Sequence, residues 1–422
     1  MFKTVINSIL NLLKTEEVRK KIFYSLIILV VFRVLAAIPV VGIPADALSK
    51  LFAGSNFGEL LSTISGGVLQ TASLVAIGLN PYINASVTLQ LLTPVIPKLA
   101  ALRKEGSAGR RAISMYTRWL TIPLAILQSF VIYSTLRGFG IIGALPTLTL
   151  VAMIGTLTAG AMIMMWMGEL ISEDGIGGGT SYLIFLGILS GIPGHISTNF
   201  RVMDPSQKIT FIALNIIIIA IVVFISEAER RIKVMYSRRV RQGATQESYI
   251  PLKLTQSGVM PVIFAISLLS FPQLIAQFFL SRNINANINH IAQTVYNGLA
   301  NPYVQNIGTF VLVILFSLFY ITIVFDTDEI SEDLQKQGAF IQGIRPGKNT
   351  SKFLRGSALK LTAVGALVLA ILSILPNLLM QVGFLQSSLI SGTGFLILVG
   401  VVLDIKRQVQ SMAVVRDYNR YL

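Results

Sequence analysis

The stretch SLVAIGLNPYINASVTLQLL, residues 73–92, decides how this chain is read. It is the centre of an apolar segment, Phe57 to Pro97, that is longer than the roughly 20 residues a membrane-spanning helix needs. Ser65-Gly66-Gly67 breaks the segment early, and Gly78-Leu79-Asn80-Pro81 breaks it in the middle, where Pro81 removes a backbone donor. The segment therefore predicts a short half-helix near 57–67 that does not span the membrane, followed by a helix that does.

Polar side chains occur along that spanning helix, at Asn84, Ser86, Thr88 and Gln90. Amides and hydroxyls at membrane depth are tolerated where they are buried in protein or face water. We therefore expect this helix to line a pathway through the membrane.

The composition is that of a polytopic helical membrane protein. The mean hydropathy is +0.72, and 53% of the residues are hydrophobic while 13% are charged. The 422 residues leave room for about ten spans of roughly 20 residues with their loops. The apolar runs place the spans at about 21–39, 71–95, 113–136, 146–169, 180–195, 209–228, 257–280, 305–325, 357–379 and 384–403.

The distribution of basic residues predicts the orientation. With the N-terminus inside, the outer loops hold only five of the 34 Lys and Arg residues: Lys50, Arg137, Arg201, Lys208 and Arg282. The positive-inside rule then places both termini in the cytoplasm. The first 20 residues repeat apolar side chains at helical spacing, which predicts an amphipathic helix on the cytoplasmic surface over 1–20. The tail, 404–422, is expected to be cytoplasmic as well.

The spans divide into two halves of opposite topology. Five spans, within 21–195, precede an outer hinge loop at 196–208, and five follow within 209–403. The second and seventh spans share the pattern G-x-x-P-x-I, from Gly78 to Ile83 and from Gly258 to Ile263. Interrupted helices at corresponding positions mark the substrate pathway in inverted-repeat membrane proteins. The pattern therefore predicts that these two spans line the pathway.

Two inner loops, 229–254 and 326–356, are longer than orientation requires. The first is basic, and the second begins acidic and turns basic. For any single basic residue, two explanations are equally good: it sets the membrane topology by its charge near lipid headgroups, or it contacts a partner. The length of the loops favours a docking surface for a large anionic partner such as ribosomal RNA, or for a motor protein.

The sequence contains no catalytic constellation. His195 and His290 are isolated, and the absence of cysteine excludes a disulfide, a thiolate metal site and a cysteine nucleophile. The glycine run from Gly175 to Thr180 lacks the Gly-Lys-Ser/Thr ending of a phosphate loop, so an inner turn is expected there. No carboxylate lies at mid-span, which counts against an ion-coupled transporter. We expect no enzymatic activity, cofactor or metal.

Residues 73–92 resemble the second-helix signature of the SecY/Sec61 family of protein-conducting channels, and the similarity extends along nearly the whole chain. Further motifs in the order typical of the family are Ile64-Ser65-Gly66-Gly67, Pro251-Leu252-Lys253, Gly258-Val259-Met260-Pro261, Gly338-Ala339-Phe340, Gly343-Ile344-Arg345-Pro346-Gly347 and Gly392-Thr393. The Gly-Ile-Arg-Pro-Gly segment resembles bacterial members.

The resemblance implies an all-α membrane protein with ten transmembrane helices in two inverted five-helix halves around a central hourglass pore. A plug half-helix falls on about 56–70 and contains Ser65, Gly66 and Gly67. A narrow ring of branched apolar side chains loses its water and stops ions, yet offers a passing peptide no fixed partner. The family's pore ring corresponds here to Ile83, Val87, Ile184, Ile188, Ile263 and Ile397.

The resemblance also implies a lateral gate between helices two and seven. Gln90 and Gln256 are expected either to hydrogen-bond across the closed gate, a contact of about 0.6–2 kcal/mol, or each to satisfy its own neighbouring backbone. The family usually has asparagine at the position of Gln256 and isoleucine at the position of Val87. These two differences bear on the strength of the gate and the tightness of the seal.

The function that the resemblance implies is a passive, gated channel for unfolded secretory polypeptides, which binds signal sequences and releases membrane helices sideways into the lipid bilayer. The implied location is the bacterial plasma membrane. The implied partners are the membrane subunits SecE and SecG, the SecA motor ATPase and the ribosome, the last two contacting Arg238, Arg239 and Arg345. An inverted-repeat transporter of a small solute and an insertase without a pore are the alternatives.

Overall fold

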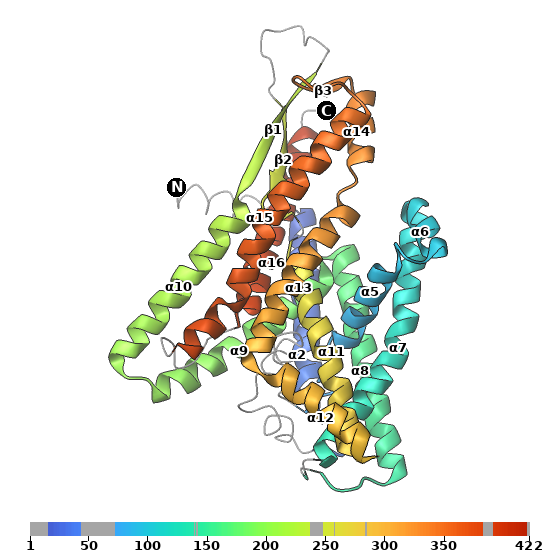
Figure 1. The fold of residues 1–422 in the computed structure, drawn as a ribbon, viewed down its shortest axis with the longest axis vertical. Helices are drawn as coiled ribbons and strands as arrows, with labels where there is room; N and C mark the ends of the chain where they lie inside the picture. Colours follow the sequence, from blue (N-terminus) through green and yellow to red (C-terminus); the bar gives the residue numbers. More distant parts are fainter. Residues whose placement is uncertain are drawn as a thin grey trace. The chain divides into compact units, whose positions relative to one another are not determined.

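The computed structural model describes residues 16–43, 72–138, 140, 142–236, 248–256, 258–282, 285–382 and 391–419. Each of the ten expected spans coincides with a helix, which Figure 1 labels. These helices are α2 (Glu16–Ala37), α5 (Asn80–Leu92), α7 (Ser107–Gly138), α8 (Thr147–Asp174), α9 (Gly179–Val202), α10 (Pro205–Glu227), α11 (Met260–Arg282), α13 (Pro302–Val324), α15 (Lys348–Gln381) and α16 (Gly392–Asn419).

Within the described residues, six helices are long and apolar enough to cross a membrane. A seventh span is formed if α5 is counted together with α6 (Pro97–Lys104), from which it is bent by 99°. The remaining elements were not among the expected spans: α12 (Ala286–Ala300), α14 (Thr327–Lys336), β1 (Glu229–Tyr236), β2 (Ser248–Lys253) and β3 (Ala339–Ile341).

The chain forms two compact units. The first unit comprises Met1–Met203, Ile266–Gln305 and Leu389–Leu422, and the second comprises Asp204–Ala265 and Asn306–Ser388. The boundary between Met203 and Asp204 falls inside the expected hinge. However, Ile266–Gln305 and the segment that begins at Leu389, both expected in the second half, belong to the first unit. The units are therefore not the two inverted halves, whose symmetry stays a prediction.

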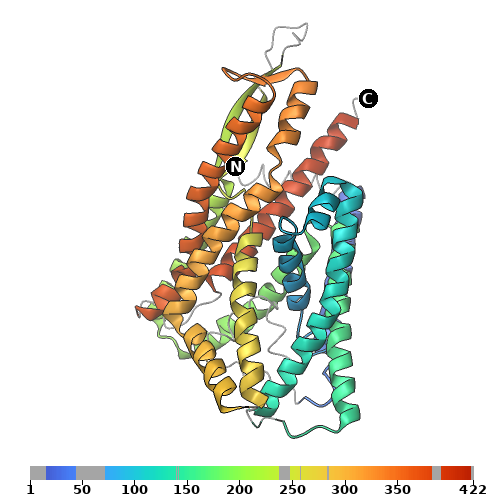
Figure 2. The same cartoon turned by 45° about the vertical axis from the view of Figure 1, so that its right-hand side comes forward.

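In the first unit, antiparallel helices pack around a common core. α7 contacts α5 and α8, and α8 also contacts α2 and α9; Figure 2 shows α7 and α8 side by side. The core contains Leu136, Met153 and Leu157, all fully buried. Helix α8 approaches the chain ahead of α5 so closely that a β-carbon at Gly160 would lie 1.9 Å from the carbonyl oxygen of Leu74. Only glycine permits this approach.

In the second unit, the two long inner loops fold into a three-stranded antiparallel sheet of order β2-β1-β3, together with α14 and the first turns of α15. The pairing runs from Glu229 opposite Lys253 to Val234 opposite Ser248. Successive side chains of a strand point to opposite faces, so Ile232 and Val234 enter a core with Leu354, while the residues between them are exposed. The loops 229–254 and 326–356 are thus folded over their described residues.

Two helix boundaries differ from the expected ones. The second span was expected to begin near residue 71, but residues 72–79 form turns and α5 begins at Asn80. The hinge was expected at 196–208, but α9 continues to Val202 and α10 begins at Pro205, so the connection is two residues long. Pro193 lies inside α9 because a membrane helix tolerates proline where neighbouring groups satisfy the freed backbone.

Candidate functional site

The second and seventh spans begin with the same turn. Gly78 has φ +61° and Gly258 has φ +63°, and each lies two residues before the first residue of its helix. The amide of Gly78 donates to the carbonyl of Val75 at 2.8 Å, and that of Gly258 to Thr255 at 3.0 Å. Glycine adopts a positive φ at no steric cost. The sequence match between the two spans is therefore also a match of backbone structure.

This turn places two expected pore residues equivalently. The amide of Ile83 donates to Leu79 at 2.9 Å, and the amide of Ile263 donates to Val259 at 3.3 Å. The backbone of each isoleucine thus hydrogen-bonds to the turn that precedes its helix, and each isoleucine lies five residues after its glycine. Both side chains are 3% exposed.

All six expected pore-ring side chains are buried, with at most 7% of their surface exposed. Ile83 and Val87 lie one helical turn apart on α5. Ile184 and Ile188 lie on α9, which packs against α16, the helix of Ile397. Ile263 belongs to the second unit and the other five to the first. The structure describes each residue within its own unit, and the assembled ring stays a prediction.

The two gate glutamines form local hydrogen bonds. Nε2 of Gln90 donates to Oγ of Ser86, one turn earlier on α5, at 3.0 Å. Oε1 of Gln256 accepts from the backbone amide of Lys253 at 2.9 Å. Gln256 thus bonds to its neighbouring backbone, as in the second alternative, whereas the partner of Gln90 is a side chain on the same helix. A bond between the two glutamines stays a prediction, since the residues belong to separate units.

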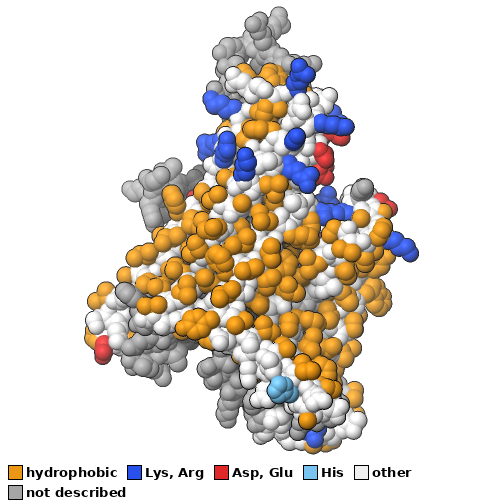
Figure 3. Space-filling model, in the orientation of Figure 1, with side chains coloured by type: hydrophobic (Ala, Val, Ile, Leu, Met, Phe, Trp, Pro, Cys, Tyr) orange, Lys and Arg blue, Asp and Glu red, His pale blue; other side chains and the backbone are white. Residues whose placement is uncertain are grey.

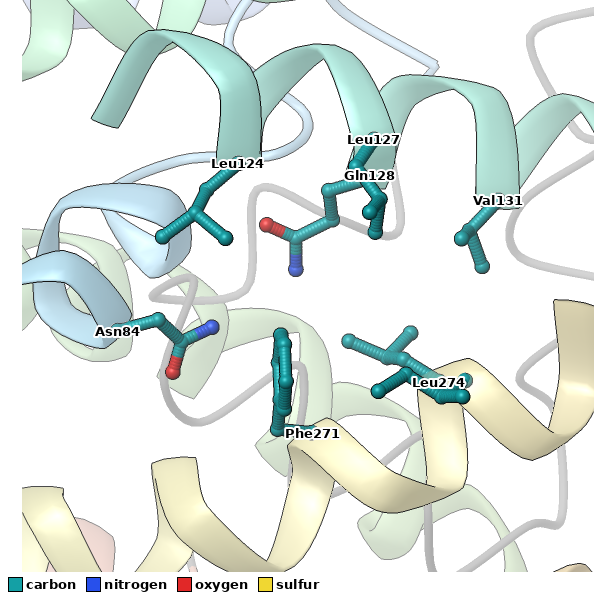
Figure 4. Close-up of a pocket in the computed structure, with 8 residues that line it drawn as sticks. Asn84, Leu124, Leu127, Gln128, Val131, Phe271 and Leu274 are labelled. Atoms are coloured by element: carbon teal, nitrogen blue, oxygen red, sulfur yellow. The ribbon is translucent and has the colours of Figure 1, made fainter. Parts of the chain in front are cut away.

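A hollow in the first unit lies between α5, α7 and the part of α11 that belongs to this unit. Its cavity volume is about 10 Å³, and it is partly open to the surroundings. Figure 4 shows the side chains of Asn84 and Gln128 pointing into it from two different helices. The rest of the lining is apolar: Leu124, Leu127, Val131, Phe271, Leu274 and Ile275.

The hollow has room for about one water molecule, so an apolar segment with an occasional polar group would enter only if the surrounding helices move apart. Its walls supply apolar contact, and the two carboxamides can each donate and accept hydrogen bonds. Gln128 is 6% exposed and forms no hydrogen bond to a described residue. The sequence analysis noted Asn84 but missed Gln128. The available signal was a glutamine in the middle of an apolar span.

The inner turn expected at the glycine run connects α8 to α9. The amide of Ile176 donates to Oγ of Ser25 at 3.2 Å, and the amide of Gly179 donates to Oγ of Ser172 at 2.9 Å. These donors are occupied by protein groups, so the turn does not offer them to a phosphate. Among the described residues, no three His, Asp or Glu side chains gather to hold a metal ion.

Basic side chains gather at the sheet end of the second unit, as the blue atoms in Figure 3 show. Arg345 is exposed, and its backbone carbonyl accepts a hydrogen bond from Oγ1 of Thr350 at 3.0 Å. Arg231 lies 4.8 Å from the ring centre of Tyr249. A hydrogen bond to the Glu229 carboxylate, and secondly the charge of Tyr249, raise the pKa of Arg231. Arg345 is therefore one of several exposed basic side chains at this end of the second unit.

Some expected site residues lie outside the described part of the chain. They are the plug residues Ser65, Gly66 and Gly67, and the contact residues Arg238 and Arg239. Their roles stay predictions.

Comparisons with known proteins identify relatives along the full length. A family model described as SecY matches residues 73–406. The protein translocase subunit SecY of Mycobacterium bovis is 37% identical over 448 residues, which cover 99% of this chain and 100% of the relative. The subunit of the same name from Corynebacterium glutamicum is 36% identical over 441 residues, with the same coverage of 99% and 100%.

Solved structures share the fold. One described as "The structure of a protein conducting channel" matches with a TM-score of 0.70 at 19% identity, over 93% of this chain and 92% of that chain. Sec61 in the canine ribosome-channel complex from the endoplasmic reticulum matches with a TM-score of 0.65 at 18% identity, over the same 93% and 92%. The family model and the full-length relatives together show that this chain belongs to the SecY family.

Proposed function

We propose that this chain is the channel subunit of a bacterial protein translocase. It conducts unfolded secretory polypeptides across the plasma membrane and releases apolar helices sideways into the lipid. The chain performs no chemistry of its own, and the driving energy comes from its partners. The relatives that carry the name protein translocase subunit over their whole length support this function.

One structural observation carries the proposal beyond family membership. The helices α5 and α11 each begin two residues after a left-handed glycine, and each places a buried isoleucine at the same point after that turn. The resemblance to the family places both isoleucines on the substrate pathway. Branched apolar side chains at such a point resist wetting by ions and offer a moving chain no fixed partner. Ile83 and Ile263 are therefore proposed as pore-ring residues, together with Val87, Ile184, Ile188 and Ile397.

The hollow between α5, α7 and α11 is proposed as part of the lateral gate. A signal sequence is an apolar helix, and the hollow presents apolar side chains with two amides. Gln90 and Gln256 hydrogen-bond within their own segments, which leaves no strong polar bond for an arriving helix to break there.

The partners proposed are SecE and SecG in the membrane, and SecA or the ribosome on the cytoplasmic side. The folded sheet domain supports a docking role, because a surface that only sets topology does not need a hydrophobic core of its own. Arg345 is proposed as a contact residue on this surface. The excess of basic residues on one side supports cytoplasmic termini.

The natural absence of cysteine provides a direct test. A single cysteine is placed at Ile83, a secretory chain with its own cysteine is arrested midway, and disulfide formation is measured. A crosslink that follows the register of the arrested chain supports the proposal. The matched control is Val151→Cys, on the exposed face of α8, where 63% of the side chain is accessible. Absence of the Ile83 crosslink in an engaged complex, or equal crosslinking at both positions, would contradict conduction through this ring.

A further inference from the structure

The helix α12 is an amphipathic element that the pathway does not use. Its 15 residues, Ala286–Ala300, connect α11 to α13. We propose that α12 lies inclined in the membrane interface, with one apolar face inserted among lipid chains and a polar face without Lys, Arg, Asp or Glu turned to water.

The connections at its two ends restrict where α12 can run. α11 ends at Arg282 and α13 begins at Pro302, so three residues precede α12 and one follows it. Both neighbouring helices are long and apolar enough to cross a membrane, and consecutive spans meet their connection at the same face. A helix of 15 residues is about 22 Å long. Its last turn is hydrogen-bonded to Gln273, nine residues before the end of α11, so α12 starts at that face and inclines back along α11.

Three faces of α12 have different surroundings. Ile288, Ile291 and Val295 lie on one side and are 36%, 64% and 38% exposed. Ala292, on the side next to the protein, is 5% exposed. Polar side chains occupy the remaining, exposed side: His290, Gln293, Thr294 and Asn297. This division into apolar, packed and polar sides is the pattern of a helix lying at an interface.

A contact to α11 fixes the rotation of α12. Nε2 of Gln273, a side chain that is 1% exposed, donates to the backbone carbonyl of Leu299 at 2.8 Å. The bond attaches the last turn of α12 to the neighbouring span. The apolar side is therefore held away from the protein core, and its exposure does not arise from a free rotation of the helix.

Lipid is the occupant that the surroundings favour. The chain continues directly from α12 into Tyr303 and Val304, which are 69% and 44% exposed at the start of a membrane span. The exposed apolar side of α12 therefore leads into surface that the membrane already covers. No Lys, Arg, Asp or Glu occurs between 286 and 300. Insertion is thus driven by apolar area and does not require anionic lipid.

The bond from Gln273 places α12 against the part of α11 that leads to its end at Arg282. In the orientation proposed above, this part of α11 lies in the outer half of the membrane.

Fluorescence quenching tests the proposal on the full-length chain. Ile291→Cys and its control Gln293→Cys place one label on opposite sides of α12, each at an exposed position. An environment-sensitive nitrobenzoxadiazole dye is attached to each, and the protein is reconstituted in phosphatidylcholine vesicles. The quenchers are phosphatidylcholine with a shallow nitroxide, and aqueous iodide.

The expected result is opposite behaviour of the two sites. The label at 291 is quenched by the nitroxide lipid and protected from iodide, whereas the label at 293 is quenched by iodide. Ile288→Cys repeats the result for 291, since it lies on the same side of the helix. Equal iodide quenching at 291 and 293 would overturn the proposal. Protection of 291 from both quenchers would overturn it as well, because protein rather than lipid would then cover this face.

Discussion

The side-chain oxygen of Gln408, on α16, accepts a hydrogen bond from the backbone amide of Gly177, in the turn between α8 and α9. The next amide back in the chain, Ile176, donates to Ser25 on α2. The turn is thus bonded to side chains of two helices that are remote in sequence. It fastens α2, α8, α9 and α16 together at one end of the first unit.

The first prediction concerns the glycine at the end of this turn. A β-carbon at Gly179 would lie 1.7 Å from the carbonyl oxygen of Gly168. Gly179→Ala therefore forces α8 and α9 apart and is expected to destabilise the protein by about 1–3 kcal/mol, as overpacking does. Thermal unfolding of the purified protein measures the change. The control is Gly178→Ala, whose nearest neighbour would lie at 4.0 Å, and equal melting of the two variants would contradict the prediction.

The second prediction concerns the turn before α11. Gly258 has φ +63°, and a β-carbon there would meet nothing within 4 Å. The cost of Gly258→Ala is therefore purely conformational, about 1–2 kcal/mol for a left-handed residue. Asparagine enters this region more readily, so Gly258→Asn is expected to unfold at a higher temperature than Gly258→Ala. The reverse order would show that the turn adopts another conformation in the membrane.

The third prediction concerns the seal. Ile83→Asn puts an amide at a buried position of the proposed ring, so the constriction holds water more readily. We expect ion leakage in planar bilayers and export of substrates with defective signals. Ile126→Asn, on α7 where 47% of the side chain is exposed, serves as the control. Unchanged conductance and unchanged signal selectivity for Ile83→Asn would show that Ile83 is not part of the pore ring.

The fourth prediction concerns the hollow of Figure 4. Gln128 is 6% exposed, and its carboxamide points into the hollow. Gln128→Leu makes the lining more apolar, so the closed packing of α5, α7 and α11 is expected to gain stability while export with weakly apolar signals slows. Melting temperature and export rate are measured together. A variant that is more stable but exports equally fast would show that the hollow does not take part in opening.

The membrane helices were predictable from sequence because a long apolar run in a membrane can satisfy its backbone polar groups as a helix and in few other ways. All ten expected spans coincide with helices, although α5 begins later than hydropathy indicated. The residues before it are apolar, but 72–79 form turns, the last of them around the left-handed Gly78. Pore-ring residues were identified through resemblance alone, since buried isoleucines such as Ile184 have the same pattern as ordinary packing residues.

The sheet domain was not predictable in the same way. Ile232 and Val234 alternate with basic residues in β1, and the charge and length of the loop predict a docking surface without indicating strands. The strand β3 is three residues long and follows β1 by about a hundred positions. No local sequence pattern therefore predicts that β1 and β3 pair. α12 was missed because it is amphipathic and uncharged, and hence neither a span nor a charged loop.

The continuity of α15 has a consequence for how the second unit responds to force. Its 34 residues make a rod of about 51 Å. One end holds Leu354 in the core of the sheet domain, and further along the rod Gly365 lies against the carbonyl of Leu254, just ahead of α11. Strand β1 follows α10 after one residue. A partner that tilts the sheet domain is therefore expected to move α15 as one rod, and with it the segment at Leu254 that leads into the turn before α11.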